Sequence, residues 1–144
     1  MKIRKKLMVF LAVLMVFLVG CGSNNNGGTA YTEVNVEDGI KFSLNDDTLK
    51  SSRATFTLTN ETEAAVNYST HEYHFEQMKD GQWQEFTGTA QSDWEKETSV
   101  LEAGDAVELS YDWKTLCGST AKNMQYRLII LVNDSPVAAE FAAQ

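Results

Sequence analysis

Apolar and polar residues alternate along several short segments of this chain, and this period of two constrains the fold more than any other feature. Residues 53–59 (RATFTLT) place alanine, phenylalanine and leucine on one face, which is the pattern of a strand with one face in water. Residues 106–113 (AVELSYDW) alternate in the same way. Residues 125–132 (QYRLIILV) are apolar on both faces beyond Arg127, so they should form a central strand.

Two turn signals divide the rest of this pattern into hairpins. Asp80 and Gly81 separate the aromatic arms of residues 73–86, and Asp-Gly is a strong signal for a two-residue hairpin turn. Residues 133–136 (NDSP) supply turn chemistry before a last apolar run that ends at Phe141. Further short strands are expected at residues 40–44 and 98–101. Seven or eight strands without sustained helical periodicity predict an all-β, antiparallel, immunoglobulin-like β-sandwich.

The N-terminus has a different character from the rest of the chain. A basic start (MKIRKK) precedes an uninterrupted apolar run of 14 residues at positions 7–20. As a helix this run would be about 21 Å long, short of the roughly 30 Å hydrocarbon core of a bilayer. Residues 1–20 are therefore interpreted as a secretory signal peptide, which is removed from the mature protein.

The signal ends in LVGC at residues 18–21, which resembles the lipobox of bacterial lipoproteins. The resemblance implies cleavage between Gly20 and Cys21 and attachment of two acyl chains through the Cys21 sulfur. Two chains give stable membrane attachment where one would be marginal. We expect residues 21–30 (CGSNNNGGTA) to be a lipidated cysteine and flexible tether, and residues 31–144 to be the folded domain. The expected location is the extracytoplasmic face of the cell membrane.

Charge limits the classes of partner. Four of the 12 basic residues lie before the apolar run, so the chain from Cys21 onward has 8 basic and 20 acidic residues, a formal charge of −12. Such a surface repels the phosphates of nucleic acids and anionic lipid headgroups. It keeps a protein soluble, although it could also attract cations or a basic partner. Binding to nucleic acid is therefore not expected.

The order of several motifs resembles that of a bacterial Ig-like domain carried by exported lipoproteins. The resemblance covers about residues 39–141 and implies a sandwich with a binding or spacer role and without enzymatic activity. Cys117 and Asn123–Met124 depart from the usual pattern of the family. The motifs are a threonine-rich strand ending in Asn60, Tyr68, KDGQW at 79–83, LEAGDAVEL at 101–109, YDW at 111–113, Gly118 and QYRLI at 125–129.

Few residues suggest site chemistry. His71 and His74 lie in HEYHFE and invite a metal hypothesis, but residues three apart on a strand point to opposite faces. Both histidines are therefore expected to be exposed rather than to bind one ion. Cys117 is interpreted as a partly buried thiol, because acylation of Cys21 leaves it no disulfide partner in the chain. A copper site of the cupredoxin type would need a histidine between Cys117 and Met124, and none is present.

We predict no catalytic, cofactor or metal site. The phases of Trp83 and Trp113 place them in the core, whereas Trp94 lies among polar neighbours (QSDWEKE) and is the candidate exposed binding aromatic. The function expected is that of a membrane-anchored, non-catalytic binding or accessory module for an unidentified envelope protein or glycan. The alternatives are an Ig-like protease inhibitor acting through residues 88–99 and an extracytoplasmic metal carrier.

The lipoprotein interpretation predicts the outcome of one substitution. A Cys21→Ser chain should lose its lipid mass and leave the membrane fraction, because the sulfur that carries the acyl chains is gone. Mass spectrometry and membrane fractionation of the expressing bacterium measure both effects. A variant that stays in the membrane with its signal uncut would contradict the lipobox interpretation.

Overall fold

The computed structural model of this protein describes residues 28–86 and 93–144. The predicted signal peptide, the cleavage site between Gly20 and Cys21, and most of the predicted tether lie outside the described residues. Within the described ranges, the helices are too short to cross a lipid bilayer.

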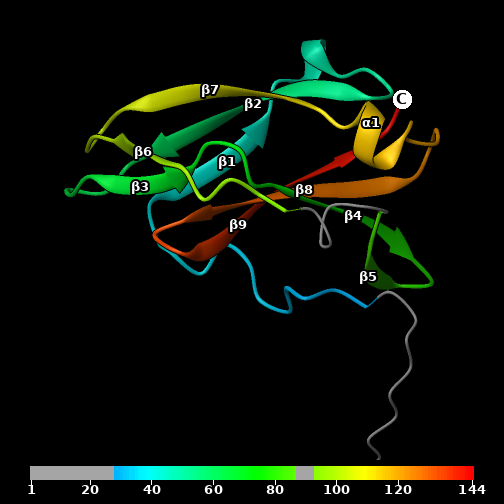
Figure 1. Ribbon diagram of the computed structural model, residues 1–144, viewed down its shortest axis with the longest axis horizontal. Helices are drawn as coiled ribbons and strands as arrows, with labels where there is room; N and C mark the ends of the chain where they lie inside the picture. Colours follow the sequence, from blue (N-terminus) through cyan, green and yellow to red (C-terminus); the bar gives the residue numbers. More distant parts are fainter. Residues whose placement is uncertain (1–27, 87–92) are drawn as a thin grey trace, which may run out of the picture.

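Nine strands form two antiparallel sheets in the described part of the chain, which confirms the all-β, Ig-like sandwich (Figure 1). The smaller sheet has the order β1 (Ile40–Leu44), β2 (Arg53–Asn60), β7 (Ala106–Asp112). The larger sheet has the order β5 (Gln82–Glu85), β4 (His74–Lys79), β8 (Gln125–Val132), β3 (Val66–Ser69), β6 (Thr98–Leu101), and β9 (Ser135–Ala142) also pairs with β8. A 3₁₀ turn, η1 (Asp46–Thr48), and one helical turn, α1 (Lys114–Cys117), lie in connections.

One of the nine strands, β3, is not predicted by the sequence patterns. It has four residues, VNYS, with Val66, Tyr68 and Ser69 buried and only Asn67 exposed. So short a segment cannot show a sustained period of two. Its place is fixed by its neighbours: it pairs with β6 along its whole length and with the end of β8 through Tyr68 and Val132.

The alternation predicted from the sequence produces one aromatic core between the two sheets. Trp113 is fully buried, as its phase predicts, and its ring stacks on Phe75 with 4.7 Å between centroids. Phe75 also stacks on Tyr126 at 5.5 Å. Aromatic rings dominate the energetics of such a core because each buries a large apolar area. Other fully or nearly fully buried members are Phe56, Leu58, Leu128, Ile130, Val132 and Val137.

Strand β8 is central, as its two apolar faces predict. It pairs with β9 from Gln125 to Val132 on one edge. Its other edge pairs first with β4, through residues 126–129, and then with β3. Leu128 and Ile130 face the core, whereas Ile129 is equally buried but does not belong to the core cluster. The outer face of β8 is therefore also covered, and what covers it defines the candidate site below.

Both predicted hairpin turns are two-residue connections with left-handed backbone. Asp80 and Gly81 have φ values of 53° and 75° and join β4 to β5. Asn133 and Asp134 have φ values of 48° and 64° and join β8 to β9. Positive φ at both central positions matches the right-handed twist of a hairpin. The Asn133–Asp134 turn reaches this conformation without glycine.

This difference predicts that Asp134→Gly stabilises the domain by roughly 0.5–1 kcal/mol, since glycine adopts positive φ without a steric penalty. Urea unfolding measures the change. Gly81→Ala is the opposite control: among the described residues nothing lies within 4 Å of its added Cβ, so only the backbone cost of about 1 kcal/mol applies. Destabilisation by Asp134→Gly would contradict the backbone argument.

Candidate functional site

Buried polar residues gather on the outer face of the six-stranded sheet, away from the aromatic core. His74 and Glu76 come from β4 and Arg127 from β8, and all three are buried. The register of β4 and β8 brings them together, because Glu76 lies opposite Arg127 and His74 lies opposite the neighbouring Ile129. Residues 28–36, named here the N-terminal segment, cover them. Its first residue, Gly28, forms a β-bridge with Gln84 of β5.

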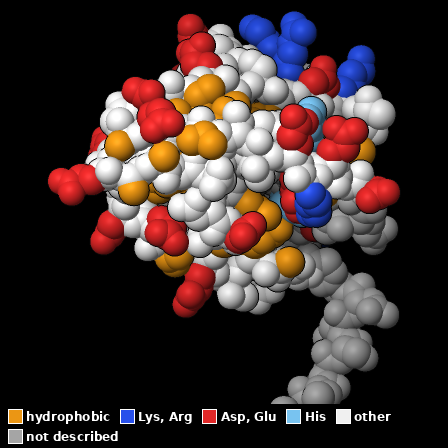
Figure 2. Space-filling view, turned by 60° about the vertical axis from the view of Figure 1, so that its left-hand side comes forward, with side chains coloured by type: hydrophobic (Ala, Val, Ile, Leu, Met, Phe, Trp, Pro, Cys, Tyr) orange, Lys and Arg blue, Asp and Glu red, His pale blue; other side chains and the backbone are white. Residues whose placement is uncertain are grey.

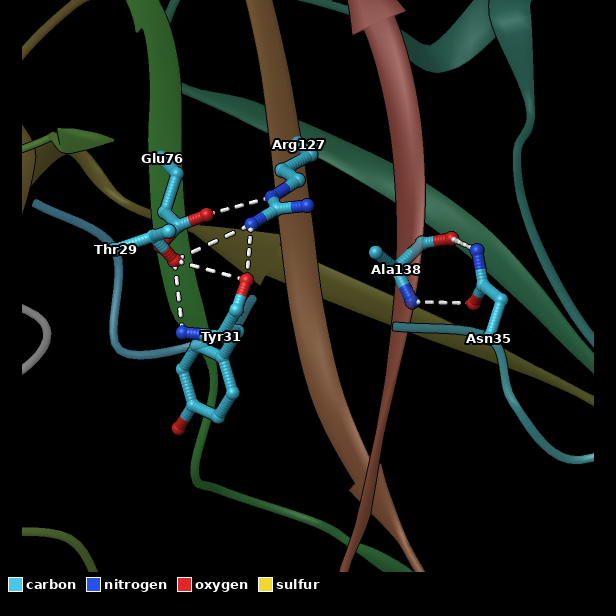
Figure 3. Close-up of polar contacts among 6 residues, drawn as sticks. All are labelled: Thr29, Tyr31, Asn35, Glu76, Arg127 and Ala138. Carbon is cyan, nitrogen blue, oxygen red and sulfur yellow. Dashed lines mark hydrogen bonds and ion pairs between the residues drawn. The ribbon is translucent and has the colours of Figure 1, made fainter. Parts of the chain in front are cut away.

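Arg127 holds the N-terminal segment to the sheet (Figure 3). Its Nε donates to Oε2 of Glu76 at 2.5 Å, while Nη2 donates to the carbonyl oxygen of Tyr31 at 2.9 Å and to Oγ1 of Thr29 at 3.3 Å. The ring of Trp83 lies 4.6 Å from the guanidinium carbon. Arg127 and Glu76 are each only 3% exposed. The ion pair is therefore desolvated, and its hydrogen bonds offset that cost.

Trp83 contacts the outer face of the sheet, so its predicted place in the core is wrong. Its partner in the ladder is Met78, which lies two residues from Glu76 and therefore points to the same side. The pleat thus directs Trp83 toward the guanidinium of Arg127. The aromatic residue from this arm of the hairpin that reaches the core is Phe86, which follows the last residue of β5. Its ring packs on Phe75 and Tyr126.

The far end of the N-terminal segment covers the free edge of β9. The side chain of Asn35 accepts from the backbone N–H of Ala138 at 2.8 Å and donates to its carbonyl oxygen at 3.2 Å (Figure 3). The backbone N–H of Asn35 also donates to the carbonyl of Pro136 at 3.0 Å. Unpaired strand edges invite pairing with other chains. These bonds therefore both satisfy the edge of β9 and fix the path of the segment.

A second buried cluster surrounds Glu72, which lies between β3 and β4. Its Oε1 is 2.9 Å from Nε2 of His74, and its Oε2 accepts from Nζ of Lys96 at 2.5 Å. Burial alone would raise the pKa of Glu72, but the bonds from Lys96 and His74 outweigh it and lower that pKa. Burial, with Glu72 and Glu76 nearby, raises the pKa of Tyr31 to about 12.

The two histidines differ in burial, and only His71 is exposed as the sequence predicts. His74 was expected to be exposed but is buried, because the ring of Tyr31 covers it at 5.0 Å between centroids. Within the described residues its Nδ1 has no hydrogen-bond partner. His71 is exposed, and its Nε2 lies 2.9 Å from Oε2 of Glu97. The two rings contact different carboxylates and do not converge on one site.

Trp94, the candidate exposed aromatic, is half-buried. Its ring packs against Tyr73 at 4.9 Å and His74 at 6.4 Å between centroids. It therefore belongs to the rim of the core. Residues 88–92 of the predicted inhibitor loop, 88–99, lie outside the described residues. In the described part, Lys96 binds Glu72 and Thr98 begins β6.

An open groove of about 610 Å³ lies on the same outer face, over β3, β6 and the end of β8. Ser69, Leu131, Glu97 and Asp134 are among the residues that line it. The Ser69 hydroxyl accepts from the Leu131 N–H at 3.2 Å. Acidic side chains greatly outnumber basic ones on the face presented in Figure 2, in keeping with the formal charge. The groove favours basic or hydrogen-bond-donating groups over anions.

Cys117 is half-buried at the end of α1. Burial, and then the nearby carboxylate of Glu85, raise the pKa of the thiol to about 12. The thiolate is the nucleophilic form of cysteine, so at neutral pH this side chain stays protonated. It packs as a small apolar group against the core, as the sequence predicts.

The sequence interpretation did not identify Arg127, Glu76 and Glu72 as the residues that organise this face. One signal was present: a single arginine in the otherwise apolar run at 125–132. A charge in a strand buried on both faces must be paired inside the protein. Its partners, however, depend on the β4–β8 register and on the path of the N-terminal segment, which no local pattern specifies.

Comparison with known proteins identifies one family. The family model described as a bacterial Ig-like domain matches residues 36–142. No curated protein sequence matches the chain significantly. Among solved structures, the Pseudomonas fluorescens alkylpurine DNA glycosylase AlkC, bound to DNA containing an abasic site analog, aligns with a TM-score of 0.36 and 16% identity. The alignment covers 75% of this chain and 31% of that one, so the chain spans about a third of its length.

The desolvated ion pair predicts a large effect of Arg127→Met. The substitution leaves Glu76 buried without its charge partner and should lower the free energy of unfolding by about 3–5 kcal/mol. The double variant Arg127→Met with Glu76→Leu should recover most of that loss, because no uncompensated charge remains. Urea unfolding of the single and double variants measures both. A double variant no more stable than the single one would refute this account.

The raised pKa predicts an unreactive thiol. In a Cys21→Ser chain, where Cys117 is the sole cysteine, iodoacetamide at pH 8 should react at least roughly a hundredfold more slowly in the native state than in urea. The native rate should rise only as the pH approaches about 12. Mass spectrometry of timed samples gives the rates. Similar rates in the two states would contradict the burial of this thiol.

Proposed function

The chain belongs to the bacterial Ig-like domain family, and from this premise we propose that it is a non-catalytic binding module held at the outer face of the bacterial membrane by lipid on Cys21. Bacterial Ig-like domains are generally non-catalytic accessory modules. The lipobox motif at residues 18–21 supports the anchor, and the acidic surface supports a partner other than nucleic acid.

One observation supports the display role above the others: residues 22–27, named here the linker, lead to one end of the six-stranded sheet, and the groove lies at its other end along β8. The N-terminal segment begins at Gly28 beside β5, and the groove lies over β3 and β6. Strand β4, with β5 beside it, pairs with one end of β8, and β3, with β6 beside it, pairs with the other end (Figure 1). Glu76 pairs with Arg127 and Tyr68 with Val132, so five residues of about 3.3 Å each separate the two pairings by roughly 17 Å along β8. The groove is thus turned away from the point where the chain leads to the lipid.

The linker is short enough to keep the end of the sheet that carries β5 near the bilayer. Six residues, 22–27, separate the lipidated cysteine from Gly28, and the seven steps from Cys21 to Gly28 span at most about 25 Å. The hydrogen bonds of Arg127 to Tyr31 and Thr29 fix the following residues on the sheet. The end of the sheet that carries β5 is therefore held near the bilayer, and the groove at the other end is presented to a partner in the envelope, either a protein or a glycan.

Site-specific photo-crosslinking in intact cells tests this proposal. A photoreactive residue at Thr98, which lines the groove, should capture a discrete envelope partner. The matched control is the same residue at Gln82, an exposed position of β5 at the opposite end of the sheet, which should give no such product. A Cys21→Ser chain with the probe at Thr98 should lose the product, since it is no longer held at the membrane.

Two results would overturn the proposal. Identical products from Thr98 and Gln82 would show that the groove has no special role. An undiminished product from the Cys21→Ser chain would show that membrane attachment does not contribute to the encounter. The abundance and folding of each variant in the cells are checked by immunoblotting and by resistance to added protease.

A further inference from the structure

The geometry points to a binding site for a divalent transition-metal ion, of the Zn²⁺ class, formed by His71, Glu95 and Glu97. All three side chains are exposed, and one donor atom from each lies within 4.8 Å of the others. The Nε2 atom of His71 is 2.9 Å from Oε2 of Glu97 and 3.7 Å from Oε2 of Glu95. This inference goes beyond the proposed function and does not depend on it.

The backbone brings these residues together and holds them there. Ser69, the last residue of β3, pairs with Thr98, the first residue of β6. Just beyond this pair, the N–H and Oγ1 of Thr70 both donate to the carbonyl oxygen of Glu97, at 3.0 and 3.2 Å. His71 therefore follows a fixed crosslink between two chain segments. Only side-chain rotation is needed to complete a site, so little conformational entropy opposes binding.

Within residues 28–86 and 93–144, Glu95 and Glu97 form ion pairs with His71 and not with a lysine or arginine. Lys96 lies between Glu95 and Glu97 in the chain, but its ammonium group binds the buried Glu72. Glu95 and Glu97 therefore both face the imidazole of His71. Their side chains are 79% and 65% exposed, and that of His71 is 49% exposed, so an ion can reach all three donors from solvent.

The donor set selects the class of ion. An imidazole nitrogen with two carboxylate oxygens suits Zn²⁺ and similar transition-metal ions, whereas Ca²⁺ and Mg²⁺ prefer oxygen ligands alone. Ligand distances of about 2.0–2.2 Å in a tetrahedral site place donor atoms roughly 3.3 Å apart. The present separations of up to 4.8 Å differ from that by rotations of exposed side chains. Three protein ligands leave a fourth position for water or for a group of a partner.

The site differs from the metal hypothesis drawn from the sequence, which joined His71 to His74. His74 is buried and bound to Glu72, so it contributes nothing to this cluster. Glu97 also lines the groove. An ion at this position would crosslink the loop after β3 to the segment before β6, and its open coordination position would lie at the end of the groove.

Titration of the untagged full chain in detergent with ZnCl₂ tests the site. We expect one equivalent to bind and the Tm to rise with Zn²⁺ concentration, because an ion that binds the native state stabilises it. His71→Ala, Glu95→Gln and Glu97→Gln should each weaken binding at least tenfold. Glu63→Gln, an exposed acidic position remote from the cluster, is the matched control and should titrate like the unchanged chain.

Imidazole NMR distinguishes this site from general binding to an acidic surface. The chain has two histidines, so only the His71 resonances should shift on addition of Zn²⁺, while those of the buried His74 stay constant. Equal responses of both rings, or equal affinities of the unchanged chain and the His71→Ala variant, would overturn the inference. The Tm of each variant without metal shows that the substitutions of these exposed residues leave the fold intact.

Discussion

The buried ion pair of Arg127 and Glu76 is the interaction on which the outer half of the structure depends. A guanidinium placed in a strand that is covered on both faces cannot be left without partners, because the cost of desolvation is several kcal/mol per ion. Glu76 supplies the opposite charge, and Tyr31 and Thr29 supply the remaining acceptors. The N-terminal segment is thus required by the chemistry of Arg127, and it in turn determines where the chain leaves the domain.

This arrangement gives the sandwich a partial third layer. The inner face of β8 packs on the aromatic core, as in any two-sheet domain, while Ile129 on the outer face is buried as completely as Ile130 on the inner one. The N-terminal segment covers β4, β8 and the edge of β9, and the groove remains where that cover ends, over β3 and β6.

Local patterns predicted the features that have local causes. The period of two placed Trp113 in the core, the Asp80–Gly81 and Asn133–Asp134 turns set two hairpins, and the apolar faces of β8 made it central. The features that failed depend on register. The outward direction of Trp83 follows from its pairing with Met78. The cluster of His71 with Glu95 and Glu97 follows from the pairing of β3 with β6, and β3 was too short to predict.

The proposed anchor limits where a partner can be. A linker of at most about 25 Å and a separation of roughly 17 Å along β8 place the groove within about 40 Å of the bilayer surface. A partner must therefore lie in the membrane or in the layer of the envelope just outside it. Because the N-terminal segment is fixed to the sheet through Arg127 and Asn35, the groove keeps a fixed position relative to Gly28. The groove and the His71 cluster at its end then reach the partner together, so a ligand of the fourth metal position and a segment in the groove would belong to the same molecule.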